Sequence, residues 1–139
     1  MTKLKSLHML DTNIVSHIIK GDDPGILKRL PKLQIGAVII SSVTEAELLY
    51  GLIKRGSPSG LTNRIHEFLT RVEVLPWDRQ VAVSYAKLRT ACEAKGVSLG
   101  DLDMMIAAHA VATHAILVTR DKAFKHLIPH GLKCESWTA

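Results

Sequence analysis

The fold is decided near the N-terminus by residues 7–13, which read Leu-His-Met-Leu-Asp-Thr-Asn. The first four of these residues form a short apolar run, typical of a buried strand. The Asp11-Thr12-Asn13 group that follows is typical of a helix start, because such side chains accept hydrogen bonds from the free N–H groups of a first helical turn. The stretch therefore predicts a strand that runs directly into a helix, with a carboxylate at the junction.

The rest of the sequence repeats this alternation of strand-like and helix-like segments. Further strands are predicted at 35–40, 72–75, 115–119 and 133–137. Helices are predicted at 14–20, 24–30, 43–54, 61–70, 78–95, 102–113 and, more briefly, 121–126. The segment 56–60, Gly-Ser-Pro-Ser-Gly, is expected to break the chain between two of these helices. Strands separated by helices form a parallel sheet covered on both faces, so we expect a three-layer α/β/α fold with about four to five strands.

Length and composition favour one globular domain over residues 1–139. The chain has 139 residues, of which 47% are hydrophobic, enough for a core of its own. Its apolar runs are far shorter than the roughly 20 residues that cross a bilayer. The basic N-terminus reaches Asp11 too soon for the apolar core of a signal peptide, so we expect a cytoplasmic protein. The net charge of +5 favours a polyanionic partner.

Several conspicuous side chains receive structural interpretations. Cys92 and Cys134 form neither a metal motif nor a disulfide framework and are expected to be buried thiols. His109 lies in the middle of an apolar helical segment and is interpreted as a core histidine. Trp77 and Trp137 are interpreted as packing residues of the core or the sheet edge.

Acidic residues follow the predicted strands. In an open parallel sheet the active site lies beyond the carboxyl ends of the strands, and Asp11 and Asp121 both stand there. Each also has an ordinary explanation as a helix cap. Glu45 and Glu47 both follow the second predicted strand. Glu47 lies at the border of the apolar side and is favoured for a site, whereas Glu45 fits a solvated position or a capping box with Ser42.

Two more acids open the helix predicted at 102–113. Acidic side chains in a first turn complement the helix dipole, which explains Asp101 as an exposed cap. Asp103 is followed by the apolar run Met-Met-Ile-Ala-Ala and is expected near the buried end of the helix. A buried charge is costly unless it is paired or bound to a metal ion, so Asp103 is the functional candidate of the two.

The joint placement of these acids predicts a metal site formed by Asp11, Glu47, Asp103 and Asp121. Four carboxylates in one cleft repel one another unless a divalent cation lies among them. Oxygen ligands without a His or Cys cluster favour Mg²⁺, or Mn²⁺ in its place, over Zn²⁺. Such an ion activates water and stabilises the attacking and leaving oxygens of a phosphodiester. An acidic pocket on a basic protein therefore indicates nucleic-acid hydrolysis.

At these residues the chain resembles the PIN-domain nucleases and, within them, the VapC-type toxins of type II toxin–antitoxin systems. The resemblance covers nearly the whole chain. It rests on five segments in one order, namely MLDTN at 9–13, ISSVTEAELLYG at 40–51, DMMIAAHA at 103–110, LVTRD at 117–121 and ESW at 135–137. One such segment alone is weak support, whereas all five in this order and spacing are specific.

The resemblance implies an Mg²⁺-dependent endoribonuclease whose catalytic cluster is Asp11, Glu47, Asp103 and Asp121. As metal ligands it implies Asp11 and Asp103, with Glu47 and Asp121 bound directly or through water. Supporting polar positions of the family correspond here to Thr12, Asn13 and Thr119. The resemblance also implies a homodimer, an antitoxin whose tail covers the cleft, and an RNA substrate, which in many relatives is transfer RNA.

Two other functions stay open. Haloacid-dehalogenase-like phosphotransfer enzymes also carry an Asp after the first strand, but they use a second Asp two residues on, where this chain has Asn13. A catalytically inactive PIN domain that binds RNA or antitoxin would keep the fold without the chemistry. The presence of all four acids counts against that alternative. No motif selects the RNA, the bond that is cut or the number of metal ions.

Overall fold

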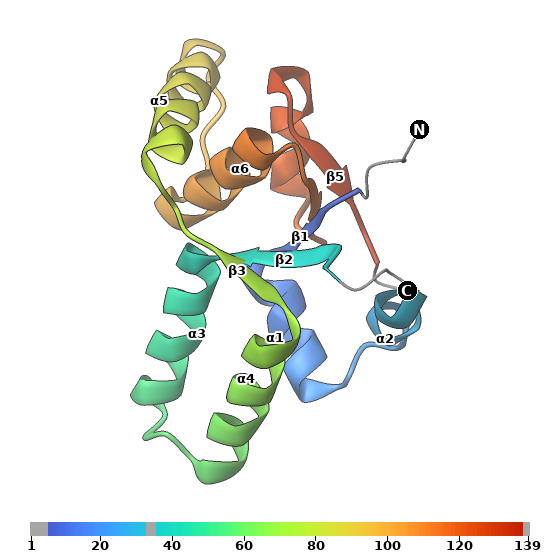
Figure 1. Cartoon of the computed structure of the whole chain (residues 1–139). Helices are drawn as coiled ribbons and strands as arrows, with labels where there is room; N and C mark the ends of the chain where they lie inside the picture. Colours follow the sequence, from blue (N-terminus) through green and yellow to red (C-terminus); the bar gives the residue numbers. More distant parts are fainter. Residues whose placement is uncertain (1–5, 33–35, 138–139) are drawn as a thin grey trace.

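The computed structural model describes residues 6–32 and 36–137 and contains one five-stranded sheet (Figure 1). The strands are β1 (His8–Leu10), β2 (Val38–Ser41), β3 (Glu73–Leu75), β4 (Ile116–Val118) and β5 (Lys133–Glu135). They lie in the order β3-β2-β1-β4-β5, and every neighbouring pair is parallel. The predicted three-layer parallel fold is thereby confirmed. Residue 35, the predicted start of the second strand, lies outside the described residues.

The helices cover both faces of the sheet. In Figure 1, α1 (Thr12–Lys20), α2 (Pro24–Arg29), α3 (Ser42–Lys54) and α4 (Ser59–Arg71) lie below it. Above it lie α5 (Arg79–Ala94) and α6 (Asp101–Thr113). Two 3₁₀ helices complete the chain, η1 (Leu30–Lys32) and η2 (Lys122–His130). Side chains of successive strand residues point to opposite faces of a sheet. Met9 therefore packs into the cluster around α5 and α6, and Leu10 into the cluster around α1 to α4.

Side-chain caps set most of the helix starts. Asp11 accepts a hydrogen bond from the Ile14 N–H, Ser41 from Val43 and Asp78 from Val81, as expected for helix N-caps. The element boundaries differ from the predicted ones by few residues.

Two predicted segments were wrong in detail. Helix α4 begins at Ser59, inside the segment expected to be a break, because the Pro58 carbonyl already accepts from the Thr62 N–H at 2.9 Å. The short helix predicted at 121–126 is the longer 3₁₀ helix η2, which continues past that range and ends at Gly131 with φ +103.

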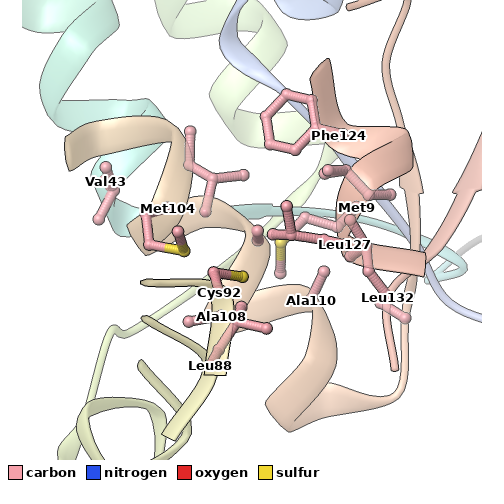
Figure 2. Packing of buried hydrophobic residues seen from close by; sticks show 14 of the residues in the cluster. Met9, Val43, Leu88, Cys92, Met104, Ala108, Ala110, Phe124, Leu127 and Leu132 are labelled. Carbon is pink, nitrogen blue, oxygen red and sulfur yellow. The ribbon is translucent and has the colours of Figure 1, made fainter. Parts of the chain in front are cut away.

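The larger core lies between the sheet and the upper helices. Figure 2 shows Leu88, Cys92, Met104 and Leu127 among the side chains that pack together in this core. Cys92 is fully buried and Cys134 partly buried, and both are free thiols, as predicted. Burial raises the pKa of the Cys92 thiol, which keeps it protonated and unreactive.

The polar side chains inside the fold have partners that explain their burial. His109 is almost completely buried and shares a 2.7 Å hydrogen bond with Ser41 Oγ, as expected for a core histidine. Burial lowers the pKa of His109, so the ring is neutral at neutral pH. Trp137 is also buried and donates from Nε1 to Glu135 Oε1 at 2.6 Å. Trp77 donates to the Met105 carbonyl at 3.0 Å, so both tryptophans have the predicted packing role.

Among the described residues, the helices all fall short of the length and apolarity that crossing a membrane demands.

The neighbours Leu127 and Ile128 give a matched test of the upper core. Leu127 is fully buried, whereas Ile128 is 50% exposed. We expect Leu127→Ala to lower the free energy of unfolding by about 2–5 kcal/mol through lost burial and a cavity. Ile128→Ala should change it by no more than about 0.5 kcal/mol. Urea unfolding followed by circular dichroism measures both values, and equal effects of the two substitutions would contradict the described packing.

Candidate active site

An open polar cleft of about 490 Å³ lies beyond the carboxyl ends of β1 and β4. The chain builds the sheet outward from β1 through β2 to β3 and then resumes at β4 on the other side of β1. A crevice opens at such a reversal, and this is where α/β folds place their ligands. The cleft is lined by Asp11, Thr12, Asn13, Ser16, Glu47, Asp103, Arg120, Asp121 and Phe124. All four predicted acids therefore come together in one place.

Asp11 is the most buried of the cleft acids, with 5% of its surface exposed. Its Oδ1 accepts the Ile14 N–H at 2.9 Å, and its carboxylate also takes a hydrogen bond from the Thr119 hydroxyl. Burial raises the pKa of Asp11, the two hydrogen bonds oppose this, and the charges of Asp103 and Asp121 raise it further. Asp11 is therefore both the cap of α1 and a member of an acidic cluster.

Asp103 enters the cleft from the first turn of α6. The side chain is partly buried, and burial raises its pKa, followed by the charges of Asp121 and Glu47. Asp101, two residues earlier, is exposed and does not line the cleft. The sequence-based choice between these two acids agrees with their placement.

Glu47 is held in the cleft by a hydrogen bond from a neighbouring helix. Thr12 Oγ1 donates to Glu47 Oε1 at 2.6 Å, and the same hydroxyl lies 3.4 Å from Thr44 Oγ1. Helix α1 therefore orients an acid carried by α3. Glu45 does not line the cleft, which agrees with the preference for Glu47.

Asp121 lies at the open side of the cleft, on the turn after β4. It is exposed, and its Oδ1 accepts the Ala123 N–H at 2.9 Å as the cap of η2. Its own N–H donates to Thr119 Oγ1 at 3.1 Å. Thr119 thus contacts both Asp11 and Asp121, and Asn13 lines the cleft with its side chain exposed.

Three cleft residues were not predicted from the sequence, namely Ser16, Arg120 and Phe124. Ser16 lies one helical turn after Thr12 and donates to its carbonyl at 3.1 Å, so helical periodicity was a usable signal. Arg120 stands between two predicted residues within the segment 117–121. The sequence did not indicate Phe124 as a cleft residue, because an apolar ring is equally expected in the core.

The donor chemistry of the cleft fits a hard divalent cation. Four carboxylates line one cleft, and the pKa values of Asp11 and Asp103 are raised by burial and, to a lesser extent, by the charges of neighbouring acids. Within residues 6–32 and 36–137, no three His, Cys, Asp or Glu side chains already stand so that they could hold an ion together. Asp11, Glu47, Asp103 and Asp121 are the residues that would hold such a cation.

A more apolar groove continues from the cleft along α1, α3 and α4. One hollow of about 530 Å³ shares Thr12, Ser16 and Glu47 with the cleft. A second hollow of about 530 Å³ shares Ile19 and Arg64 with the first and reaches η1 and β2. We call these two hollows together the apolar groove. Basic side chains line it at Lys20, Arg55, Arg64 and Arg71.

Comparison with known proteins agrees with this architecture. The PIN domain family matches residues 8–128. Ribonuclease VapC2 of Rickettsia felis is 36% identical over 133 residues, which cover 94% of this chain and 98% of the relative. The tRNA(fMet)-specific endonuclease VapC of Salmonella typhimurium is 35% identical over 129 residues, which cover 93% of this chain and 96% of the relative.

The fold matches solved structures equally well. The crystal structure of VapBC2 from Rickettsia felis bound to a DNA fragment from its promoter superimposes with a TM-score of 0.86 at 35% identity. The match covers 94% of this chain and 98% of the other. Sequence and fold thus agree over nearly the whole length, and the chain belongs to the PIN-domain family and, within it, to the VapC ribonucleases.

Proposed function

We propose that the protein is a single-domain, cytoplasmic endoribonuclease toxin that depends on Mg²⁺ and is neutralised by a cognate antitoxin. The observation that carries this proposal is the convergence of Asp11, Glu47, Asp103 and Asp121 on one cleft at the reversal of strand order. Membership of the PIN-domain family supports it and argues against the phosphotransfer alternative. Experiment must distinguish this proposal from the alternative of a catalytically inactive domain that binds RNA or antitoxin.

In this proposal the four acids bind the cation in different ways. Asp11, which is buried, and Asp103, which is partly buried, hold the cation, because burial raises the pKa of both and a cation would offset the cost of their charges. Glu47, fixed by Thr12, and Asp121, at the open side, bind it directly or through water. A bound Mg²⁺, or Mn²⁺ in its place, would supply an activated water and stabilise charge on the phosphodiester.

RNA is the substrate that the comparisons and the charge favour. The Rickettsia felis relative is named a ribonuclease and the Salmonella typhimurium relative an endonuclease specific for tRNA(fMet). The net charge of +5 on a chain with a cluster of acids leaves the remaining surface strongly basic. Such a surface attracts a folded polyanion, and transfer RNA is our proposed substrate.

The apolar groove is the proposed path of the antitoxin tail. The solved Rickettsia felis structure is a VapBC complex, which provides the precedent for a protein partner. The groove opens into the cleft through Thr12, Ser16 and Glu47, so a tail lying in it reaches the acids. Its basic lining suits a segment that is apolar with some acidic residues.

A homodimer is the proposed assembly of the free protein. Tyr50 and Ile53 are large exposed apolar side chains three residues apart on α3, so they lie on one face of that helix. Adjacent exposed apolar side chains of this kind suit an interface better than a solvated surface.

The acids offer matched pairs for testing the chemistry. We expect Asp103→Asn and Glu47→Gln to lower the rate of RNA cleavage at least about 100-fold, because each removes a carboxylate that the proposed cation needs. Asp101→Asn and Glu45→Gln remove the same charge from the same helices outside the cleft and should leave the rate within about threefold. The assay is fragment formation from a total transfer-RNA pool by purified, antitoxin-free protein in Mg²⁺.

Two controls make that assay decisive. EDTA should stop cleavage by the wild-type protein, and Mn²⁺ should restore it. Asp11→Asn keeps a capping side chain on α1 and should be inactive but folded. If the wild-type protein cuts no RNA under any metal condition, once bound antitoxin is excluded, the result would favour the inactive binding domain over the ribonuclease.

Burial of the acids, together with their mutual repulsion, also predicts an unusual stability profile. Asp11 and Asp103 have folded-state pKa values above the ordinary value of 3.8, so the folded chain holds more protons than the unfolded chain in the range above 3.8. Their contribution to the stability of the metal-free protein therefore falls as the pH rises through these raised pKa values. We expect Asp103→Asn to raise the melting temperature in EDTA at pH 7 by a few degrees.

Asp101→Asn should act in the opposite direction in the same experiment. Asp101 is exposed in the first turn of α6, where its charge complements the helix dipole by about 0.3–1 kcal/mol. Thermal unfolding by calorimetry, in EDTA and then in Mg²⁺, checks both variants. The proposal requires Mg²⁺ to stabilise the wild-type protein more than Asp103→Asn, and equal stabilisation would contradict the assigned site.

A further inference from the structure

Arg120 is the one basic side chain among the residues that line the acidic cleft in the described structure. It follows Thr119 at the end of β4 and precedes Asp121. Its backbone position is well fixed, because the Thr119 N–H donates to the Glu135 carbonyl at 3.0 Å and the Asp121 N–H to Thr119 Oγ1 at 3.1 Å. The guanidinium therefore starts from a rigid turn between two cleft residues.

The guanidinium is not neutralised by the acids around it. Within the described residues, no ion pair joins Arg120 to Asp11, Glu47, Asp103 or Asp121. Its ion pair is with Asp23, at a long 3.9 Å between Nη1 and Oδ2, and 46% of its side chain is exposed. A guanidinium carries five N–H donors, so this contact leaves most of its donors available.

Asp23 is a fixed anchor for this contact. It is the N-cap of α2, and its Oδ1 accepts from the Gly25 and Ile26 N–H groups at 2.9 and 3.2 Å. Its Oδ2 is the oxygen that faces Arg120, and its side chain is only 13% exposed. One carboxylate thus caps a helix with one oxygen and holds the cleft arginine with the other.

This arrangement matches the recognition of a phosphate group. A planar guanidinium binds phosphate through two parallel N–H···O bonds, which an ammonium group cannot do. The four carboxylates repel a phosphodiester, so an RNA strand entering the cleft needs positive charge beyond that of a cation held by the acids. Arg120 provides a fixed positive charge at the edge of the same cleft.

We propose that Arg120 binds a non-bridging phosphate oxygen of the RNA in the cleft, and that Asp23 holds its guanidinium apart from the four acids. This inference rests on the proposed ribonuclease function. It adds a substrate-binding residue to the acids and assigns a positioning role to Asp23, the N-cap of α2, which does not itself line the cleft.

The first test compares Arg120→Gln, Arg120→Lys and Lys122→Gln. Lys122 is exposed two residues further along and does not line the cleft, so its substitution removes the same charge from the same region. We expect Arg120→Gln to lower kcat/KM for transfer-RNA cleavage at least tenfold, Arg120→Lys to recover part of the loss, and Lys122→Gln to stay within about threefold. Circular dichroism and melting temperatures establish that each variant is folded.

The second test measures RNA binding without cleavage. In the Asp103→Asn background, the dependence of RNA affinity on salt concentration reports the number of phosphate contacts. Adding Arg120→Gln should reduce the slope of log K against log salt by about 1, whereas adding Lys122→Gln should not. Equal effects of the two substitutions would show a general charge effect and overturn the proposal.

The positioning role of Asp23 has its own variant. Asp23→Asn keeps the helix cap but removes the charge that holds Arg120. We expect it to lower kcat/KM several-fold and to add nothing to the loss caused by Arg120→Gln. Wild-type rates in Asp23→Asn would overturn the positioning role.

Failure of the inference differs visibly from failure of the proposed function. A wild-type protein that cuts no RNA contradicts the function. A wild-type protein that cuts RNA alongside an equally active Arg120→Gln contradicts only the inference.

Discussion

The reversal of strand order between β1 and β4 is the constraint on which the rest of the structure depends. Crossovers between parallel strands keep one hand, so the connections made while the chain moves from β1 to β3 cover one face and those made afterwards cover the other. The carboxyl ends of β1 and β4 are left without a connection above them. Asp11 follows the end of β1 directly, and the turn of Thr119, Arg120 and Asp121 follows the end of β4. Glu47 reaches the same space from the second turn of α3 and Asp103 from the first turn of α6.

The residues that start helices also build the cleft, so local folding and chemistry use the same side chains. Asp11 and Asp121 each cap a helical segment with the carboxylate that faces the cluster. Ser41, the cap of α3, also bonds the buried His109 and so ties the helix that carries Glu47 to the helix that carries Asp103. Stability and site geometry therefore cannot be changed independently at these positions. The burial of the Asp11 and Asp103 carboxylates opposes folding, because it raises the pKa of both groups and disfavours their charged forms.

Much of this could be predicted from the sequence because short-range rules govern it. The Asp11-Thr12-Asn13 group and the apolar run after Asp103 located helices, and strand-end positions located the acids. Strand order could not be derived, because nothing local says on which side of β1 the later strands add. The start of α4 at Ser59 was missed because turn-forming residues there also begin a helix. Arg120 and Phe124 were missed as cleft residues. Which residues line a cleft depends on where three separate elements meet, and the periodicity of the sequence does not predict this. The catalytic roles of the acids stay predictions.

The cleft and the apolar groove share side chains, so a ligand that moves one of these side chains in the groove also changes the cleft. Thr12 lines both, and its hydroxyl orients Glu47, which also lines both. A ligand in the groove that turns Thr12 changes the position of an acid in the cleft and hence the affinity of the cleft for a cation. By linkage, the cation changes the affinity of the groove by the same factor. The 2.6 Å hydrogen bond between Thr12 and Glu47 is then the contact through which the proposed cation and a groove ligand would act on each other.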